Sequence, residues 1–317
     1  MRETLFIINP AAARGTTLRR WAEARAELSR LGVEFAEHVT SRAGEATEVT
    51  RAALMNGIIR VIAVGGDGTL SEVINGYIDN AGNPINRSAA VGILPSGTGS
   101  DFCRSLGLTS RAEAIDSLIS PSTRMIDAGR IVYSDKEGAT ASRSFINVAS
   151  FGLGGDVSSF VNQWRESLPP WIGGRARFAA AALRALERYR NIQVRLRLDD
   201  EREIEISSNL IVVANGKFGG AGMKLAPHAA LDDGLFDVII TDQATRLDVV
   251  KELPRIRRGG YLKNPKVTEL RARQVSILTG EPMAIDIDGE MAGHTPARLS
   301  VLPQAVRLLA GEGLNRI

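Results

Sequence analysis

Three glycines around one aspartate, GGDGT at residues 65–69, directly follow the segment RVIAV at residues 60–64, which is apolar after Arg60. This order predicts a buried strand that ends in a tight turn, with a helix beginning near Thr69. Glycines allow a backbone to approach a phosphate closely, and the N–H groups at a helix N-terminus attract anions. Asp67 would repel a phosphate unless a cation or a transferable proton lay between them. The turn therefore indicates a phosphate site with Mg²⁺ or proton chemistry.

Two further apolar runs end in turns of small residues, LFIINPAAARG at residues 5–15 and VGILPSGTGSDF at residues 91–102. There is no GxxxxGK[ST] motif, and no GxGxxG motif stands in its usual place. Apolar runs and helix-like segments alternate, which predicts an α/β domain with a mostly parallel sheet. Strands are expected at residues 4–9, 33–40, 60–65 and 89–94, and helices at residues 16–31, 44–55, 70–77 and 110–119.

The carboxyl ends of parallel strands are where such sheets bind ligands. Asn9, Thr40, residues 66–69 and residues 97–98 all stand at expected strand ends. We therefore expect these turns to converge on one nucleotide cleft.

The pattern changes near Asp127, and β-rich runs dominate the rest of the chain. This change predicts a nucleotide-binding α/β domain at residues 1–128 and a second, mainly antiparallel domain, sandwich or barrel-like, at residues 129–317. The last residues of the chain are allowed to pack as part of the first domain. Strands are expected at residues 130–134, 144–149, 192–198, 203–214, 236–241, 267–279 and 283–288, and helical insertions at residues 157–164, 175–189 and 245–257.

Cysteine and histidine are too scarce for a disulfide or a zinc site. The single cysteine, Cys103, excludes an internal disulfide, and three histidines leave no plausible zinc cluster.

The charged N-terminus enters a strand at once, so no signal peptide is expected, and no apolar run is long enough for a membrane span. We expect a cytoplasmic protein.

Basic residues gather in two stretches, residues 165–190 and residues 255–266, although the net charge is only +3. Such runs suit an anionic surface, and Trp171 beside arginines suits a membrane interface. The alternatives are solvated helix faces and a loop packed on its own domain. Nucleic acid is not an expected partner, because aromatic residues make up 5% of the chain and no binding motif is present.

The motifs GGDGTLxEVxNG, LPxGTGxDF and DGE occur in this order, and together they resemble the diacylglycerol kinase catalytic-domain family, which includes bacterial lipid kinases and the sphingosine and ceramide kinases. The resemblance extends over the whole chain. It implies an ATP-dependent lipid kinase of phospholipid metabolism, peripheral at the inner membrane face, with residues 129–317 as a β-sandwich domain for the lipid substrate. It also implies that the following residues line the ATP site: Asn9, Pro10, Ala11, Ala12, Ala13, Thr40, Gly66, Asp67, Gly68, Thr69, Leu70, Ser71, Glu72 and Thr98.

Two positions depart from that family. Ala13 stands near a position that is usually glycine, and Ser100 replaces an asparagine. Alanine narrows the permitted backbone angles, and serine lacks the amide. Neither change removes a charge, so we expect adjusted contacts and not an inactive site.

A carboxylate-rich run near the C-terminus, IDIDGE at residues 285–290, supplies candidates for the general base. Strand periodicity places Asp286 and Asp288 on one face, and Gly289 allows a turn that brings Glu290 close to Asp288. Neighbouring carboxylates raise one another's pKa, which suits a base. By resemblance this element faces the nucleotide cleft. The sequence does not decide between Asp288 and Glu290 as the base; we favour Asp288, with Glu290 as its partner or substitute and Asp67 as the third catalytic carboxylate. The alternative is an ordinary β-turn.

The loop LDDGLFD at residues 231–237 offers a carboxylate and free carbonyls, which are ligands that Mg²⁺ prefers. The resemblance implies a structural Mg²⁺ held by the carbonyls of Ala230 and Leu235 and the carboxylate of Asp233, with Asp127 linked through water. The alternative is a solvated turn.

Two other functions are weighed against the lipid kinase. An NAD kinase normally needs an Asn-Glu pair in the helix after GGDGT, and here Glu72 and Asn75 stand too near the turn. A non-catalytic nucleotide- or lipid-binding protein would not need Asp67, Asp288 and Glu290. The sequence does not name the lipid, and it leaves the oligomeric state open, with a homodimer among the options.

Overall fold

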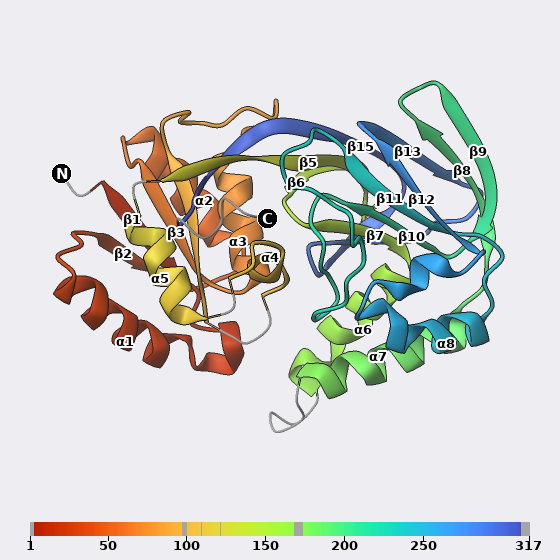
Figure 1. The fold of residues 1–317 in the computed structure, drawn as a ribbon, viewed down its shortest axis with the longest axis horizontal. Coiled ribbons are helices and arrows are strands. Elements are labelled where there is room, and N and C mark those ends of the chain that lie inside the picture. The colour runs from red at the N-terminus through yellow and green to blue at the C-terminus, as the bar shows by residue number, and fades with distance from the viewer. Residues whose placement is uncertain (1–2, 97–99, 109, 121, 168–173, 312–317) are drawn as a thin grey trace. The chain divides into compact units, whose positions relative to one another are not determined.

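The computed structural model describes residues 3–96, 100–108, 110–120, 122–167 and 174–311. The chain forms two compact units, the first comprising Met1–Ala128 and Pro303–Ile317 and the second Gly129–Leu302. Two long strands, β5 (Thr123–Asp135) and β15 (Glu290–Leu309), each pass from one unit into the other (Figure 1).

The first unit is a parallel sheet with helices on both faces. Its strand order is β15-β4-β3-β1-β2, and every pair in this order is parallel. The strands other than β15 are β1 (Thr4–Ile8), β2 (Ala36–Val39), β3 (Arg60–Gly65) and β4 (Ala90–Pro95). The helices are η1 (Ala12–Gly15), α1 (Thr17–Arg30), α2 (Glu45–Met55), α3 (Asp67–Tyr77), α4 (Asp101–Ser105) and α5 (Arg111–Ile119).

The apolar face of α1 explains how the sheet is covered. Trp21, Ala24 and Leu28 recur at helical spacing and are buried with Ile115 and Leu118 of α5 in one cluster against β1, β3 and β4. On the other face α2 and α3 pack together, α2 also contacting β1 and α3 contacting β3 and β4. Both faces of the central strands are therefore buried, as their continuous apolar runs require.

The second unit is antiparallel throughout its recorded pairings. One run of strands has the order β12-β11-β10-β7-β14-β15, and another, β9-β8-β13, joins it at β15. Its strands besides β5 and β15 are β6 (Thr140–Phe145), β7 (Val148–Gly152), β8 (Ile192–Leu198), β9 (Arg202–Ser208), β10 (Leu210–Ala214), β11 (Phe236–Thr241), β12 (Val267–Ala272), β13 (Gln274–Thr279) and β14 (Ala284–Ile287). Its helices are α6 (Leu153–Ser167), α7 (Gly174–Arg188), α8 (Arg246–Ile256) and η2 (Gly260–Lys263).

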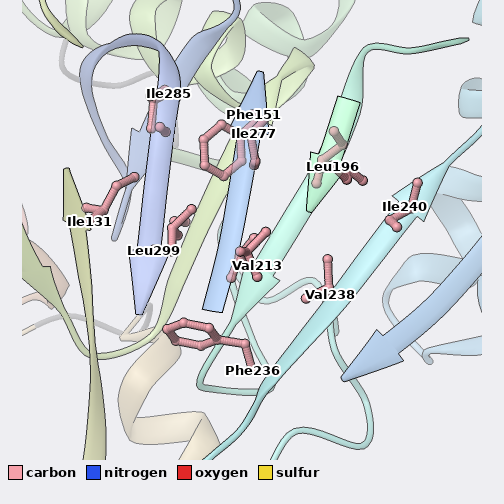
Figure 2. Packing of buried hydrophobic residues seen from close by; sticks show 14 of the residues in the cluster. Ile131, Phe151, Leu196, Val213, Phe236, Val238, Ile240, Ile277, Ile285 and Leu299 are labelled. Carbon is pink, nitrogen blue, oxygen red and sulfur yellow. The ribbon is translucent and has the colours of Figure 1, made fainter. Parts of the chain in front are cut away.

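Alternating apolar residues of these strands form one core. Phe151 and Phe236 are fully buried there, and Leu196 and Ile277 come from the β8–β13 pair. Figure 2 shows these side chains gathered between the strands with Leu299 of β15. The predicted fold class, an α/β unit with a mostly parallel sheet and an antiparallel β-sandwich unit, is confirmed.

Several predicted elements were wrong in detail. The expected strand at residues 203–214 is two strands, because Asn209 ends β9 before β10 begins. Residues 267–279 likewise form β12 and β13, with Arg273 between them. The helix after GGDGT begins at Asp67, two residues before the expected Thr69, because Gly66 occupies the N-cap. Within the described residues no helix is long and apolar enough to cross a membrane.

Candidate active site

The first unit brings three predicted nucleotide residues together at the carboxyl ends of its strands. Asn9 follows β1, and its side-chain amide Nδ2 donates to Thr69 Oγ1 at 3.1 Å while its Oδ1 accepts the Ala11 N–H at 3.0 Å. Thr40 follows β2, and its N–H donates to the carbonyl of Ile8 at 2.9 Å. The first turn, the end of β2 and the GGDGT turn therefore form one contiguous edge.

Gly66 stands at the N-terminus of α3 in an extended conformation that any residue could adopt. A Cβ on Gly66 would meet nothing within 4 Å, whereas a Cβ on Gly65 would lie 2.2 Å from Thr69 Oγ1. Packing therefore explains why residue 65 is glycine, but it does not explain the glycine at residue 66. The open space over Gly66, at the positive end of a helix, is the arrangement that admits a phosphate.

Asp67 joins the GGDGT turn to the start of α4. Its carboxylate accepts hydrogen bonds from Ser100 Oγ at 2.8 Å, from the Asp101 N–H at 2.8 Å and from the Phe102 N–H at 3.1 Å. Burial raises the pKa of Asp67, while these hydrogen bonds oppose that rise. Asp67 thus holds the start of α4, which the sequence did not predict, and in this structure it acts first as a positioning residue.

The two departures from the family pattern have clear local consequences. Ser100 is the N-cap of α4, since its hydroxyl accepts the Cys103 N–H at 3.1 Å while donating to Asp67. A serine therefore serves this position well. Ala13 has a φ of 48°, in the left-handed region where glycine is favoured. The turn after β1 is accordingly strained at Ala13.

The other predicted nucleotide residues differ in what they can reach. Leu70 and Ser71 are fully buried in α3, so their side chains contribute to packing. The carboxylate of Glu72 accepts the Ala46 N–H at 3.1 Å, in the first turn of α2. Four further residues can offer only backbone groups to a nucleotide. Pro10, Ala11 and Ala12 lie in the turn after β1, and Gly68 lies in the first turn of α3. Thr98 lies outside the described residues, as does Trp171.

In the second unit Asp288 and Gly289 form the two-residue turn between β14 and β15. Both have positive φ, 50° and 91°, which is the type I′ geometry that an Asp-Gly pair favours in hairpins. The Asp288 carboxylate accepts the N–H groups of Ile146, Asn147 and Val148 at 3.0–3.1 Å. A carboxylate has about four acceptor positions, so one remains, on Oδ2.

The electrostatics of this hairpin correct the predicted carboxylate pair. Burial raises the pKa of Asp288 to about 6, and burial, with a smaller effect of Asp288, raises that of Asp286 to about 7. Glu290 is not the coupled partner, because its carboxylate pairs with Arg143 at 2.8 Å. The pair is Asp286 and Asp288, and Asp288 lies in the turn and not on the strand face.

The predicted Mg²⁺ loop lies between β10 and β11. Asp233 accepts the Leu235 N–H at 3.1 Å and pairs with Arg271. Nearby Asp237 is 1% exposed, and neither of its carboxylate oxygens has a hydrogen-bond partner among the described residues. Oδ1 of Asp237 lies 3.8 Å from Nε of Arg271, the same guanidinium that pairs with Asp233, and burial raises the pKa of Asp237 to about 6. A hard metal ion at Asp233 would therefore have to replace Arg271. Asp127, in the first unit, instead accepts the Gln304 N–H at 2.7 Å.

Sequence reasoning missed three contributors. Arg143 on β6 neutralises Glu290. Ser158 on α6 donates to Asp286 at 2.6 Å. Glu45 accepts the Ser41 N–H and hydroxyl next to Thr40, and these bonds hold its pKa at about 2. Only Glu45 had a local signal, since a carboxylate three to four residues after a turn is a common helix-capping pattern.

Comparison with known proteins defines the class first. Residues 3–131 match the diacylglycerol kinase catalytic domain, and residues 147–310 match the YegS C-terminal NAD kinase beta sandwich-like domain. These two parts are the α/β unit and the β-sandwich of a kinase. The chain belongs to the diacylglycerol kinase catalytic domain family.

Individual relatives cover nearly the whole chain. A diacylglycerol kinase of Staphylococcus carnosus is 31% identical over 305 residues, 96% of this chain and 93% of that protein. A diacylglycerol kinase of Mycobacterium tuberculosis is 31% identical over 307 residues, again 96% and 93%. The crystal structure of a diacylglycerol kinase from Bacillus anthracis has the same fold, with a TM-score of 0.67 at 20% identity over 99% of this chain and 98% of that one.

Proposed function

We propose that the protein transfers the γ-phosphoryl group of ATP to the hydroxyl of a diacylglycerol-like or sphingoid lipid. Its membership of a kinase family and relatives named diacylglycerol kinase support the reaction class. The single structural observation that carries the proposal is Gly66, which leaves open space over the N-terminus of α3 beside Asn9 and Thr69.

On the nucleotide side, the chain supplies backbone donors and hydroxyls. The free N–H groups at the start of α3 would bind phosphate oxygens, and Thr69 Oγ1, fixed by the Asn9 amide, would present a hydroxyl to them. Asp67 would hold the turn at residues 100–102 in place while the phosphates bind. Phosphoryl transfer depends mainly on such positioning and on charge stabilisation, and Mg²⁺ bound with ATP would supply the latter.

On the acceptor side, Asp288 is the proposed base. Three backbone donors fix its carboxylate, and Oδ2 keeps one acceptor position for the proton of the lipid hydroxyl. Burial holds its pKa at about 6, close enough to neutrality for a carboxylate to exchange a proton during turnover. Glu290 would act with Arg143, as an ion pair at the rim of the same hairpin.

The structural cation would be Mg²⁺, held by the carbonyls of Ala230 and Leu235 and the carboxylate of Asp233. It would replace Arg271 at the Asp233 carboxylate and fix the loop before β11.

A lipid substrate requires contact with a bilayer, and the second basic stretch supports it. Arg257, Arg258 and Lys263 are exposed and have no ion-pair partner among the described residues, and Leu247 and Val250 of α8 are exposed beside them in sequence. In the first stretch Arg184 pairs with Glu187 and Arg190 with Glu281, while the side chains of Arg165 and Arg175 lie outside the described residues. We propose a cytoplasmic enzyme that adsorbs to anionic membranes through residues 247–263.

The test is incubation with labelled ATP, Mg²⁺ and separate acceptors: dispersed diacylglycerol, a sphingoid base, ceramide and NAD. Label in one lipid supports the proposal. Label in NAD alone would assign an NAD kinase, and ATP binding without transfer to any acceptor would assign a non-catalytic protein.

Two matched variants link the reaction to the proposed turn. Gly66→Val should keep the unfolding temperature, since its Cβ enters open space, but lose ATP binding, because that space is the phosphate site. Gly65→Ala should instead lower the unfolding temperature, because its Cβ meets Thr69. Normal ATP titration by Gly66→Val would contradict the phosphate site.

A further inference from the structure

A cavity of about 440 Å³ lies in the first unit, and it takes no part in the function proposed above. Its walls come from α1, the ends of β3 and β4, α4 and the start of α5. The lining residues are Arg20, Trp21, Glu23, Ala24, Val64, Leu94, Pro95, Ser96, Ser100, Cys103, Arg104, Leu108, Ser110 and Arg111. None of the described residues that we assign to ATP is among them; Thr98, also assigned to ATP, lies outside the described residues. A volume of this size is in the range of small-molecule sites.

One part of the lining is apolar. Trp21, Ala24, Val64 and Leu94 belong to the core cluster between α1 and the sheet, and each lines the cavity. Cys103 adds a thiol that carries no charge, since burial raises its pKa to about 12. This part can accommodate a short hydrocarbon chain but not a charged group.

The other part of the lining is basic. Arg20, Arg104 and Arg111 line it together with Glu23. Arg111 pairs with Glu23 at 2.8 Å and with Glu27 at 3.5 Å, and Arg104 pairs with Asp101 at 2.9 Å, so carboxylates neutralise these two arginines. Arg20 donates to the carbonyl of Ser96 and has no ion pair with a described carboxylate, so its guanidinium, with five N–H donors, keeps donors for an oxyanion.

A buried polar group in the lining lacks a partner. Ser96 is 2% exposed, and its hydroxyl has no hydrogen-bond partner among the described residues; the same holds for Nε of Arg111. Because an unmade buried hydrogen bond costs free energy, a ligand oxygen at this place would remove that cost. Two unsatisfied donors and the Arg20 guanidinium, next to an apolar wall, suit a ligand with an anionic head group and an apolar chain.

We propose that this cavity binds a single-chain amphipathic anion, with an oxyanion head at Arg20, Ser96 and Arg111 and a short apolar chain against Trp21, Ala24 and Leu94. A phosphate monoester and a carboxylate share this chemistry.

The same walls connect the cavity to the phosphate turn. Ser100 lines the cavity and donates to Asp67 at 2.8 Å, and Arg104, also in the lining, pairs with Asp101, whose N–H donates to the other Asp67 oxygen. A ligand in the cavity therefore lies against Ser100 and Arg104, beside the residue that fixes the GGDGT turn. We expect binding in the cavity to alter ATP affinity, a coupling that rests on the proposed function.

Calorimetric titration of the full chain tests the site directly. The probes are monooctyl phosphate, octanoate, octanol and inorganic phosphate, all below micelle-forming concentrations. Monooctyl phosphate should bind one per chain, octanoate should compete with it, and octanol and inorganic phosphate should each bind at least about tenfold more weakly, since each lacks one half of the recognition. Equal affinity for octanol, or no binding of either anion, would overturn the proposal.

Variants place the binding in the cavity. Arg20→Gln should weaken monooctyl phosphate about tenfold or more, as expected for one charge-assisted hydrogen bond. Arg19→Gln, the exposed neighbour on α1 outside the lining, should leave it unchanged. Ala24→Leu fills the floor and provides a second variant should Arg20→Gln not fold. Wild-type affinity in every folded variant would exclude the cavity.

Titrations with ATP and monooctyl phosphate together distinguish the cavity site from the proposed nucleotide site. Effector and nucleotide should bind together, each changing the other's affinity by the same factor, because coupling is reciprocal. Mutually exclusive binding of ATP and monooctyl phosphate would make the cavity part of the nucleotide site and overturn a separate effector site. If the chain bound monooctyl phosphate but no ATP, the proposed function would fail while the cavity site stood.

Discussion

At the residue scale, the structure assigns strain to one position of the first turn. Ala13 has a φ of 48° in the segment that follows Asn9. A non-glycine residue in the left-handed region costs about 1–2 kcal/mol, partly offset by the greater freedom of glycine in the unfolded chain. Ala13→Gly should therefore raise the free energy of unfolding by about 0.5–1 kcal/mol, measured by urea denaturation. Ala12→Gly, without a positive φ, is the control and should not stabilise.

A second prediction at this scale concerns Asp286, whose pKa of about 7 lies far above the ordinary value of 3.8. Below pH 3.8 the folded and unfolded states both hold the proton. Between pH 3.8 and about 7 only the folded state keeps the Asp286 proton, so the free energy of unfolding falls as the pH rises through this range. Above pH 7 the folded protein holds Asp286 as a buried charge.

Asp286→Asn removes that charge and keeps an acceptor for Ser158. The variant should unfold at a higher temperature than the wild type at pH 8, and this advantage should shrink at pH 5. Thermal unfolding at the two pH values measures it, with the exposed Asp116→Asn as control. An equal difference at both pH values would show that Asp286 is ionised in the fold.

At the element scale, α4 depends on a carboxylate far away in the sequence. Asp67 accepts two backbone N–H groups and a hydroxyl from residues 33 to 35 positions further along. Asp67→Ala would leave those donors buried, so we expect a loss of about 2–4 kcal/mol in the free energy of unfolding, as for two to three unmade hydrogen bonds. Chemical denaturation measures it. Unchanged stability together with lost turnover would instead assign Asp67 to the chemistry.

Elements with strong local signals were predictable, and those held by distant contacts were not. The apolar run before GGDGT predicted β3 and a following helix. β15 was missed because Pro296 and Pro303 interrupt it, and proline argues against a strand interior. The backbone donors to Asp288 are 140 to 142 residues away in the sequence, so no residue near Asp288 indicated that its carboxylate is buried and held in place.

At the scale of the whole molecule, reaching a lipid depends on adsorption. Each cation near an anionic surface contributes roughly 1 kcal/mol, and salt screens the attraction over about 10 Å at 0.1 M. Arg257, Arg258 and Lys263 carry charges that no described carboxylate neutralises, and Leu247 adds exposed apolar surface. The protein should therefore bind anionic vesicles, release them as salt is added and bind neutral vesicles little.

Charge reversal at these positions separates a local surface from net charge. Arg257→Glu with Arg258→Glu should weaken co-sedimentation with anionic vesicles by about tenfold or more at low salt, since four units of charge change near the membrane. Arg30→Glu with Arg87→Glu alters the net charge equally at exposed positions of the first unit and should sediment like the wild type. ATP affinity should be unchanged in both. Equal loss of vesicle binding in the two double variants would mean that overall charge, and not residues 247–263, drives adsorption. Equal binding to neutral and anionic vesicles would instead favour extraction of the lipid through apolar contacts alone.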